Sequence, residues 1–227
     1  MKIELPFEKV ANSPVFWLKK ISLFSKPSLD AEIRSITFHR GLNIIWGKSV
    51  EENPEELHPV LLTGHSVGKT TLCRMIRYCF GEDHFGTPAV ESLIRNKFPE
   101  GLVAAEILLN TELYLVLRTF SPPNISIAEK EHTLGYLFDN WKKVNKRSFK
   151  PFIEEMEKST IIHWPSRKTP DGKKNLECNH LLAWLTRDQE TRFQSLWEWR
   201  STRSESGVAQ LNKPYAEYLL RLVLELV

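Results

Sequence analysis

Residues 64–71, GHSVGKTT, combine the residue types that bind a nucleotide phosphate group. In the loop pattern G-x-x-x-x-G-K-[ST], backbone amides surround phosphate oxygens, the lysine reaches the β- and γ-phosphates, and the hydroxyl binds Mg²⁺. Gly68, Lys69 and Thr70 match the end of this pattern. Its first glycine would be residue 63, which is threonine here. The segment therefore predicts a phosphate-binding loop with one departure from the usual pattern.

Two arrangements would supply the strand that such a loop needs before it. In one, Gly47 ends a strand at 42–46, and the acidic, proline-containing residues 48–63 are an insertion before the loop resumes. In the other, HPVLLTG (58–64) is itself the strand, and Thr63 simply replaces glycine. A third interpretation is that SVGKTT only caps a helix. The order of strand, loop and helix favours nucleotide binding over this last interpretation.

The elements expected around the loop belong to a mixed α/β chain. Apolar residues recur at helical spacing over 70–81, with Arg74 and Arg77 on other faces and Gly81 as the stop. The apolar runs 101–110 and 112–120 flank a polar turn and predict an antiparallel hairpin. The other expected elements are strands at 15–24, 33–38, 42–46 and 161–164, helices at 151–160, 176–189 and 214–227, and a loop at 165–175. The region 121–176 has the least regular pattern.

Composition and charge set limits on the class of protein. The chain has 227 residues, of which 41% are hydrophobic and 26% charged, so a globular core is expected and disorder is not. A net charge of +3 permits a nucleic-acid partner without requiring one. Three cysteines without metal or disulfide spacing suggest a reducing compartment. With no signal-peptide pattern and no apolar stretch of 18 residues, a cytoplasmic location away from membranes is expected.

The succession of these segments resembles the N-terminal head lobe of SMC-like and RecF-like ABC ATPases. The resemblance covers about the first 120 residues and is carried by ISLFSKPS (21–28), ITFHRGLNIIWG (36–47), the loop with its helix (64–81), and LIRNKFPE (93–100) leading into the hairpin. It implies a P-loop NTPase fold of the ABC head type, with an antiparallel β subdomain and flanking helices. Residues 1–212 would form the lobe, and 213–227 would begin a helix leading to a coiled-coil arm.

The resemblance also implies ATP and Mg²⁺ as ligands. Lys69 and Gln189 would act in catalysis, and Thr70 and Gln189 would hold Mg²⁺, with Gln194 as an alternative glutamine. Lys26 would lie near the phosphates, and Arg40 lies just before the expected strand at 42–46. A solvent-facing role is the competing interpretation for Gln189, Lys26 and Arg40. The full nucleotide-binding set expected is Lys26, Arg40, Gly47, Gly64, His65, Ser66, Val67, Gly68, Lys69, Thr70 and Thr71.

Parts of an ATPase head of this type are missing from the sequence. We find no LSGGQ-like signature and no apolar strand that ends in Asp-Glu, since Glu106 lies in mid-strand. In the resembling family these parts lie in a C-terminal lobe, so hydrolysis is expected only with such a lobe or a second head, and a homodimer is expected. The chain would then be a piece of a larger ATPase. Its last helix is expected to expose Leu219, Leu220, Leu222, Val223 and Leu224 to a partner, although docking on its own domain is the alternative.

Basic residues cluster at 141–150 without an acid among them, and SRKTPDGKK (166–174) adds more. They predict salt-sensitive, sequence-tolerant DNA binding, against the simpler interpretation of a solvated face. The candidate DNA-contacting residues are Lys142, Lys143, Lys146, Arg147 and Lys150. Trp197 and Trp199 lie beside arginines and are expected at a protein interface, and the scattered histidines predict no zinc site.

Together these features predict an ATP-binding lobe whose Mg·ATP-driven head engagement is coupled to DNA binding or processing, in DNA repair or anti-phage defence, with an accessory effector as a further partner. The alternative is a non-hydrolysing adaptor that binds DNA or protein and keeps a degenerate loop. A stand-alone P-loop kinase or GTPase fits least, since neither an aspartate after a strand nor an Asn-Lys-x-Asp segment is present.

Overall fold

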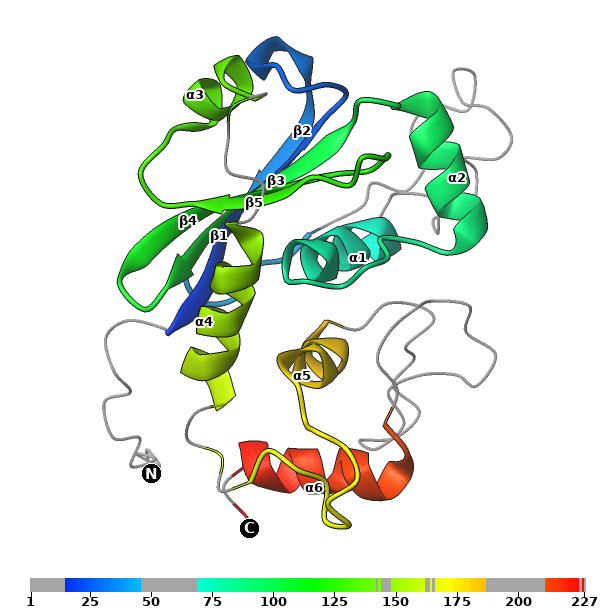
Figure 1. Cartoon of the computed structure of the whole chain (residues 1–227), viewed down its shortest axis with the longest axis vertical. Coiled ribbons are helices and arrows are strands. Elements are labelled where there is room, and N and C mark those ends of the chain that lie inside the picture. The colour runs from blue at the N-terminus through cyan, green and yellow to red at the C-terminus, as the bar shows by residue number, and fades with distance from the viewer. Residues whose placement is uncertain are drawn as a thin grey trace, which may run out of the picture.

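The computed structural model describes residues 15–45, 69–141, 143, 148–161, 164, 166–186, 211–224 and 226. In this part of the chain, a five-stranded antiparallel sheet in the order β2-β1-β3-β4-β5 is covered by helices (Figure 1). The strands are β1 (Phe16–Phe24), β2 (Glu32–Thr37), β3 (Leu102–Leu109), β4 (Glu112–Thr119) and β5 (Ser126–Glu129). The helices are α1 (Lys69–Cys79), α2 (Pro88–Lys97), α3 (Leu134–Asp139), α4 (Phe149–Ile161), α5 (Cys178–Leu185) and α6 (Lys213–Val223), with a 3₁₀ turn at Leu29–Ala31. The mixed α/β class and the antiparallel sheet are confirmed.

The predicted hairpin is β3 and β4, paired from Leu102↔Thr119 to Leu109↔Glu112. Asn110 in its two-residue turn has φ 57°, a left-handed conformation that asparagine tolerates better than most residues. Most residues of both strands are apolar because helices cover both faces of the sheet. Val103 and Ala105 pack in the cluster that includes α1 and α4, while Leu102 and Ala104 pack against α3.

Helix α1 matches the predicted amphipathic helix closely. It begins at Lys69, and Gly81 follows its last turn at φ +106°, a conformation that favours glycine and ends the helix. Met75, Tyr78 and Cys79 are buried against the sheet. The most buried part of the helix is therefore its second half.

The strand expected at 42–46 is not present over 42–45, which have no regular secondary structure. The Asn43 amide donates to the carbonyl oxygens of His39 and Gly41, and its oxygen accepts from the His39 amide at 2.8 Å. This asparagine-centred turn competes with strand pairing. It leaves Leu42 88% and Ile44 77% exposed. The arrangement in which 42–46 forms the strand before a split loop is therefore wrong for residues 42–45, and Trp46 and Gly47 lie outside the described residues.

Helix α4 corrects a second expectation. The helix predicted at 151–160 is confirmed, but Ile161, assigned to a strand, is the last residue of α4. It continues the buried stripe of Phe152 and Met156, so burial on a helical face decides its conformation. Trp164, at the other end of the expected strand, also has no strand conformation, and 162–163 lie outside the described residues.

Helix α6 begins after Asn212, whose side chain accepts from the Tyr215 amide. The expectation that its apolar residues are exposed is wrong for most of them. Leu219, Leu220 and Leu222 are at most 3% exposed, because they form a cluster with Leu176. Partly buried Val223, Trp164, Trp184 and Leu211 pack against this cluster, and only Leu224 of the expected set is well exposed, at 60%. Among the described helices none is long and apolar enough to cross a membrane.

Candidate functional site

The described part of the phosphate-binding motif is the first turn of α1. Lys69 is the first described residue of α1, and of Lys69 only the backbone is described. The half-buried Thr70 and Thr71 follow it. The first amides of a helix have no acceptor within it and favour an anion. The first turn of α1 contains no acidic residue. This end of the helix therefore fits a phosphate group. Gly47, Gly64, His65, Ser66, Val67, Gly68, Gln189 and Gln194 lie outside the described residues.

The other end of α1 is fixed to the sheet. The Tyr78 hydroxyl donates to the Thr119 carbonyl at 2.6 Å, and the Tyr78 ring packs on Phe85 with centroids 5.2 Å apart. Burial raises the pKa of the Tyr78 hydroxyl above its ordinary value, which keeps it a donor. The second half of α1 is thus anchored by packing and a buried hydrogen bond, so that its first turn has a defined direction.

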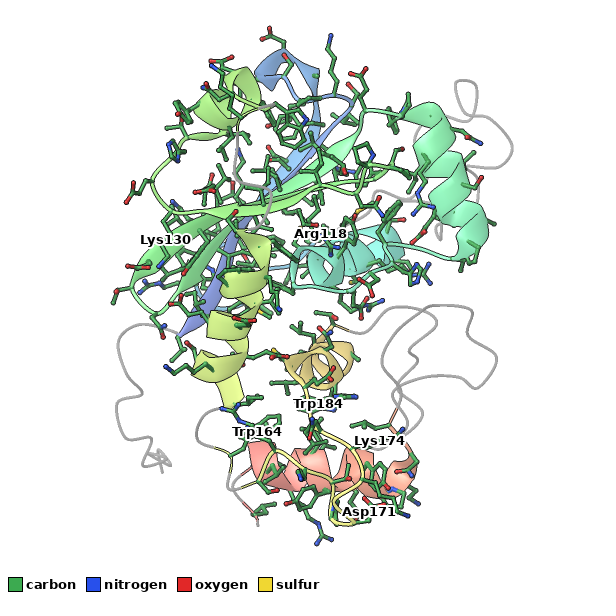
Figure 2. The ribbon with its side chains drawn as sticks, in the orientation of Figure 1. Arg118, Lys130, Trp164, Asp171, Lys174 and Trp184 are labelled. Atoms are coloured by element: carbon green, nitrogen blue, oxygen red, sulfur yellow. The ribbon has the colours of Figure 1, made fainter. Side chains whose placement is uncertain are left out.

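Arg118 of β4, labelled beside α1 in Figure 2, reinforces this anchor at the C-terminal end of the helix. Its guanidinium donates to the carbonyls of Tyr78 and Glu82 and to the Ser126 hydroxyl. It also lies 3.7 Å from the centre of the Tyr78 ring. A cation at a helix C-terminus interacts favourably with the helix dipole. Burial lowers the pKa of Arg118 from its ordinary value, but a guanidinium stays protonated in proteins.

Arg77 joins α1 to a distant part of the chain. Its Nε donates to Glu82 Oε2 at 3.0 Å, and its Nη1 donates to the carbonyl of Thr186 at 2.6 Å. Arg77 has no exposed surface, and Thr186 caps the C-terminus of α5. The helix that carries Thr70 is therefore tied to a residue three positions before Gln189, the glutamine expected to share Mg²⁺ with it.

Sequence reasoning missed both Arg77 and Arg118. Arg77 was placed on a polar face of its helix, yet it is buried, as is Arg74 at 4% exposed. Because Arg77 and Glu82 are five residues apart across Gly81, their pairing does not follow the i,i+3 or i,i+4 spacing of helical ion pairs. The only sequence signal was an arginine amid the apolar residues of β4 and of the second half of α1.

Lys26 and Arg40 do not converge on one point. The Arg40 guanidinium lies 5.2 Å from the ring centre of Trp17, near the start of β1. Lys26 follows Phe24, the last residue of β1. The seven steps from Trp17 to Phe24 span about 23 Å at the usual rise of a strand. The two side chains therefore lie toward opposite ends of β1. Nucleotide contact by Lys26 and by Arg40 stays a prediction.

The expected DNA-contacting segment is described at two positions, Lys143 and Lys150, which are both exposed. Lys150 Nζ lies 3.7 Å from Glu154 Oε1, one helical turn away, so its charge is partly balanced by an acid outside the basic run. Lys142, Lys146 and Arg147 lie outside the described residues, as do Trp197 and Trp199. DNA contact by this segment stays a prediction.

A hollow of about 390 Å³ lies between β5 and the start of α4 and has no counterpart in the sequence motifs. The Tyr114 hydroxyl donates to Glu155 at 2.6 Å, and Lys130 lies 4.7 Å from the Tyr114 ring centre while it contacts Glu112. These charged groups satisfy one another at the floor of the hollow. Within the described residues, no group of three His, Cys, Asp or Glu side chains could hold a metal ion.

The chain matches no protein-family model, no curated protein and no solved structure. The resemblance to ABC-type heads therefore depends on the loop motif and the order of the segments in the sequence.

Proposed function

We propose that this chain binds Mg·ATP as the N-terminal lobe of an SMC-like ABC ATPase head, and that ATP-driven head engagement is coupled to DNA binding or processing. The observation that supports this proposal is that α1 (Lys69–Cys79) is helical from the lysine of the GKTT motif onward and has no acidic residue in its first described turn. In this proposal the motif residues before Lys69 form the N-terminal end of the helix, where backbone amides and the helix dipole favour phosphate.

Different residues are proposed to bind the phosphates and the Mg²⁺ ion. The backbone amides of residues 65–68 and the Lys69 ammonium hold phosphate oxygens, and the hydroxyl of Thr70 and the amide oxygen of Gln189 hold Mg²⁺. When bound, the nucleotide supplies negatively charged phosphates that groups of two engaged head lobes would contact. The buried contact of Arg77 with the Thr186 carbonyl joins the second half of α1 to a residue three positions before Gln189.

This lobe is proposed to bind nucleotide without turning it over. The sequence contains no signature motif and no Asp-Glu at the end of an apolar strand. The general base and the signature are therefore proposed to come from a C-terminal lobe, with a second head completing the site. The two roles proposed for this process, DNA repair and anti-phage defence with an accessory effector, are taken from the resemblance alone.

Calorimetric titration of the full chain with Mg·ATP tests the proposal. The parent chain is expected to release or absorb heat on binding, and Lys69→Ala is expected to lose it. Lys97→Ala, an exposed lysine at the end of α2, is the matched control and should bind as the parent does. Equal binding by Lys69→Ala and the parent would show that the GKTT lysine does not hold the nucleotide.

The adaptor alternative is favoured by one structural observation. Residues 42–45 form an asparagine-centred turn and not the strand that would lead to Gly47, and residue 63 is Thr in place of the first glycine. A chain with a degenerate loop would bind DNA without nucleotide. Charge reversal at Lys142, Lys143 and Arg147 would then abolish DNA binding, while Mg·ATP would have no effect on it.

A further inference from the structure

Residues 166–175 form a small, well-defined hairpin. Lys168 and Asn175 pair across it as an isolated antiparallel bridge, and the Thr169 amide donates to the Lys174 carbonyl at 2.9 Å. The turn closes at Gly172, whose φ of +70° favours glycine. Thr169 is 3% exposed, so the hairpin has a buried base although its tip is in solvent. The sequence predicted only a loop here.

Asp171 attaches this hairpin to α6. Its carboxylate accepts from the Thr169 hydroxyl at 2.6 Å, from the Lys173 amide at 3.2 Å and from the Tyr215 hydroxyl of α6. Directly after the hairpin, Leu176 is buried in the same cluster as Leu219 and Leu220. Figure 2 shows Asp171 and Lys174 beside α6, at the lower end of the molecule. The backbone of the hairpin is therefore held from both sides.

The exposed surface of the hairpin is cationic. Asp171 is the only acid in residues 166–175, and its carboxylate already has three hydrogen-bond donors. Of the four cations, only Lys173 has an acid within 4 Å among the described residues, at 3.7 Å from Asp171. The four exposed cations are Arg167, Lys168, Lys173 and Lys174. Together with Asp171 they give the hairpin a net charge of about +3. Because the hairpin backbone is already fixed, binding loses little conformational entropy from ordering it.

We propose that the hairpin 166–175 is a docking element for double-stranded nucleic acid. It binds the phosphate backbone and makes no sequence-specific contacts with the bases. Arginine and lysine side chains neutralise phosphate charges and release counterions on binding, and such contacts carry no sequence information. Binding of single strands relies on exposed aromatic rings for base stacking. The hairpin itself has no aromatic residue, and Trp164 and Trp184, which lie before and after it in the sequence, pack against the α6 cluster. Phosphate contact with a duplex therefore fits this surface best.

This inference rests on the DNA part of the proposed function and not on nucleotide binding. The experiment is fluorescence anisotropy of the full chain with labelled 20-base-pair duplexes of two unrelated sequences, measured without nucleotide over a salt series. Lys168→Ala/Lys174→Ala is compared with Lys97→Ala/Lys158→Ala, which removes two exposed lysines elsewhere. The hairpin variant should bind about tenfold or more weakly at 0.1 M salt, and its slope of log K against log salt should fall by about 2.

A second variant tests the fixed backbone. Tyr215→Phe leaves every cation in place but removes the contact between α6 and Asp171, and it should weaken duplex binding by about two- to fivefold at an unchanged salt slope. Equal duplex affinity and salt slope for the hairpin and control double variants would overturn the proposal. Binding of acidic polypeptide or single-stranded DNA in place of duplex would also overturn it. Since Lys69→Ala should bind duplex normally in this assay, failure of the nucleotide site is recognised separately.

Discussion

Arg77 in α1 and Thr186 at the end of α5 are joined by a hydrogen bond of 2.6 Å, although 109 residues separate them in the sequence. The bond is made by a guanidinium with no exposed surface, whose other side pairs with Glu82 at 3.0 Å. The start of α1 carries the motif hydroxyl, and the segment after Thr186 carries the glutamine expected to act with it. Two distant parts of the chain are thus brought to one place by a single buried cation.

Arg77→Met is expected to destabilise the chain by about 3–5 kcal/mol, because it leaves the Glu82 carboxylate buried without its partner. Chemical denaturation followed by circular dichroism measures the change. The double variant Arg77→Met/Glu82→Gln should recover part of the loss. Arg221→Ala breaks the exposed ion pair with Glu217 and should cost at most about 1 kcal/mol. An equal, small effect of both single variants would mean that the buried pair contributes little.

Leu219→Ala is expected to cost about 2–5 kcal/mol of unfolding free energy, because its side chain has no exposed surface in the cluster with Leu176. Leu224→Ala, at a position that is 60% exposed, should change stability by no more than about 0.5 kcal/mol. Thermal and denaturant unfolding of the two variants make the comparison. Similar small effects would contradict the docking of α6 on its own chain.

The buried thiols of Cys79 and Cys178 are expected to be inert in the native protein. Burial raises the pKa of Cys79 to about 12, and burial also raises that of Cys178, although the Thr160 hydroxyl opposes this. At pH 8 the thiolate fraction of Cys79 is then about a thousandfold below that of an ordinary cysteine. Labelling of a Cys73→Ser variant with a thiol reagent should be slow when folded and complete within minutes in denaturant. Rapid labelling of the folded variant would contradict this burial.

His180 should make the chain less stable as the pH falls. Its Nδ1 accepts from the Glu177 amide at 3.0 Å, and burial lowers its pKa below the ordinary 6.5. The unfolded chain therefore binds the proton more tightly, so this contribution to stability is complete above pH 6.5 and is lost as the pH falls toward the folded pKa. His180→Gln keeps an acceptor at the same capping position without a titration. Melting temperatures of the two proteins should agree at pH 7 and favour the variant at pH 5, whereas parallel curves would exclude His180 as the cause.

Local patterns in the sequence were sufficient to predict several secondary-structure elements. Helix α1 and its stop at Gly81 follow from apolar spacing and from the backbone freedom of glycine, and the β3–β4 hairpin follows from two apolar runs around Asn110. The patterns failed at residues 42–45, where the Asn43 side chain takes the hydrogen bonds that a strand would need. They failed again at Ile161, whose apolar side chain fits a strand or a helix equally well until a buried face is chosen.

By itself the sequence determined that the residues from Lys69 onward form a helix and that this helix ends before Gly81, because apolar spacing and glycine act within a few residues. Only the tertiary structure decided which charges are buried and what they join, since Arg77 meets Thr186 and Asp171 meets Tyr215 across long stretches of chain. It also decided that Lys26 and Arg40 lie at opposite ends of β1. Such pairings depend on how the sheet and helices pack, and residue spacing carries no information about partners that are distant in the sequence.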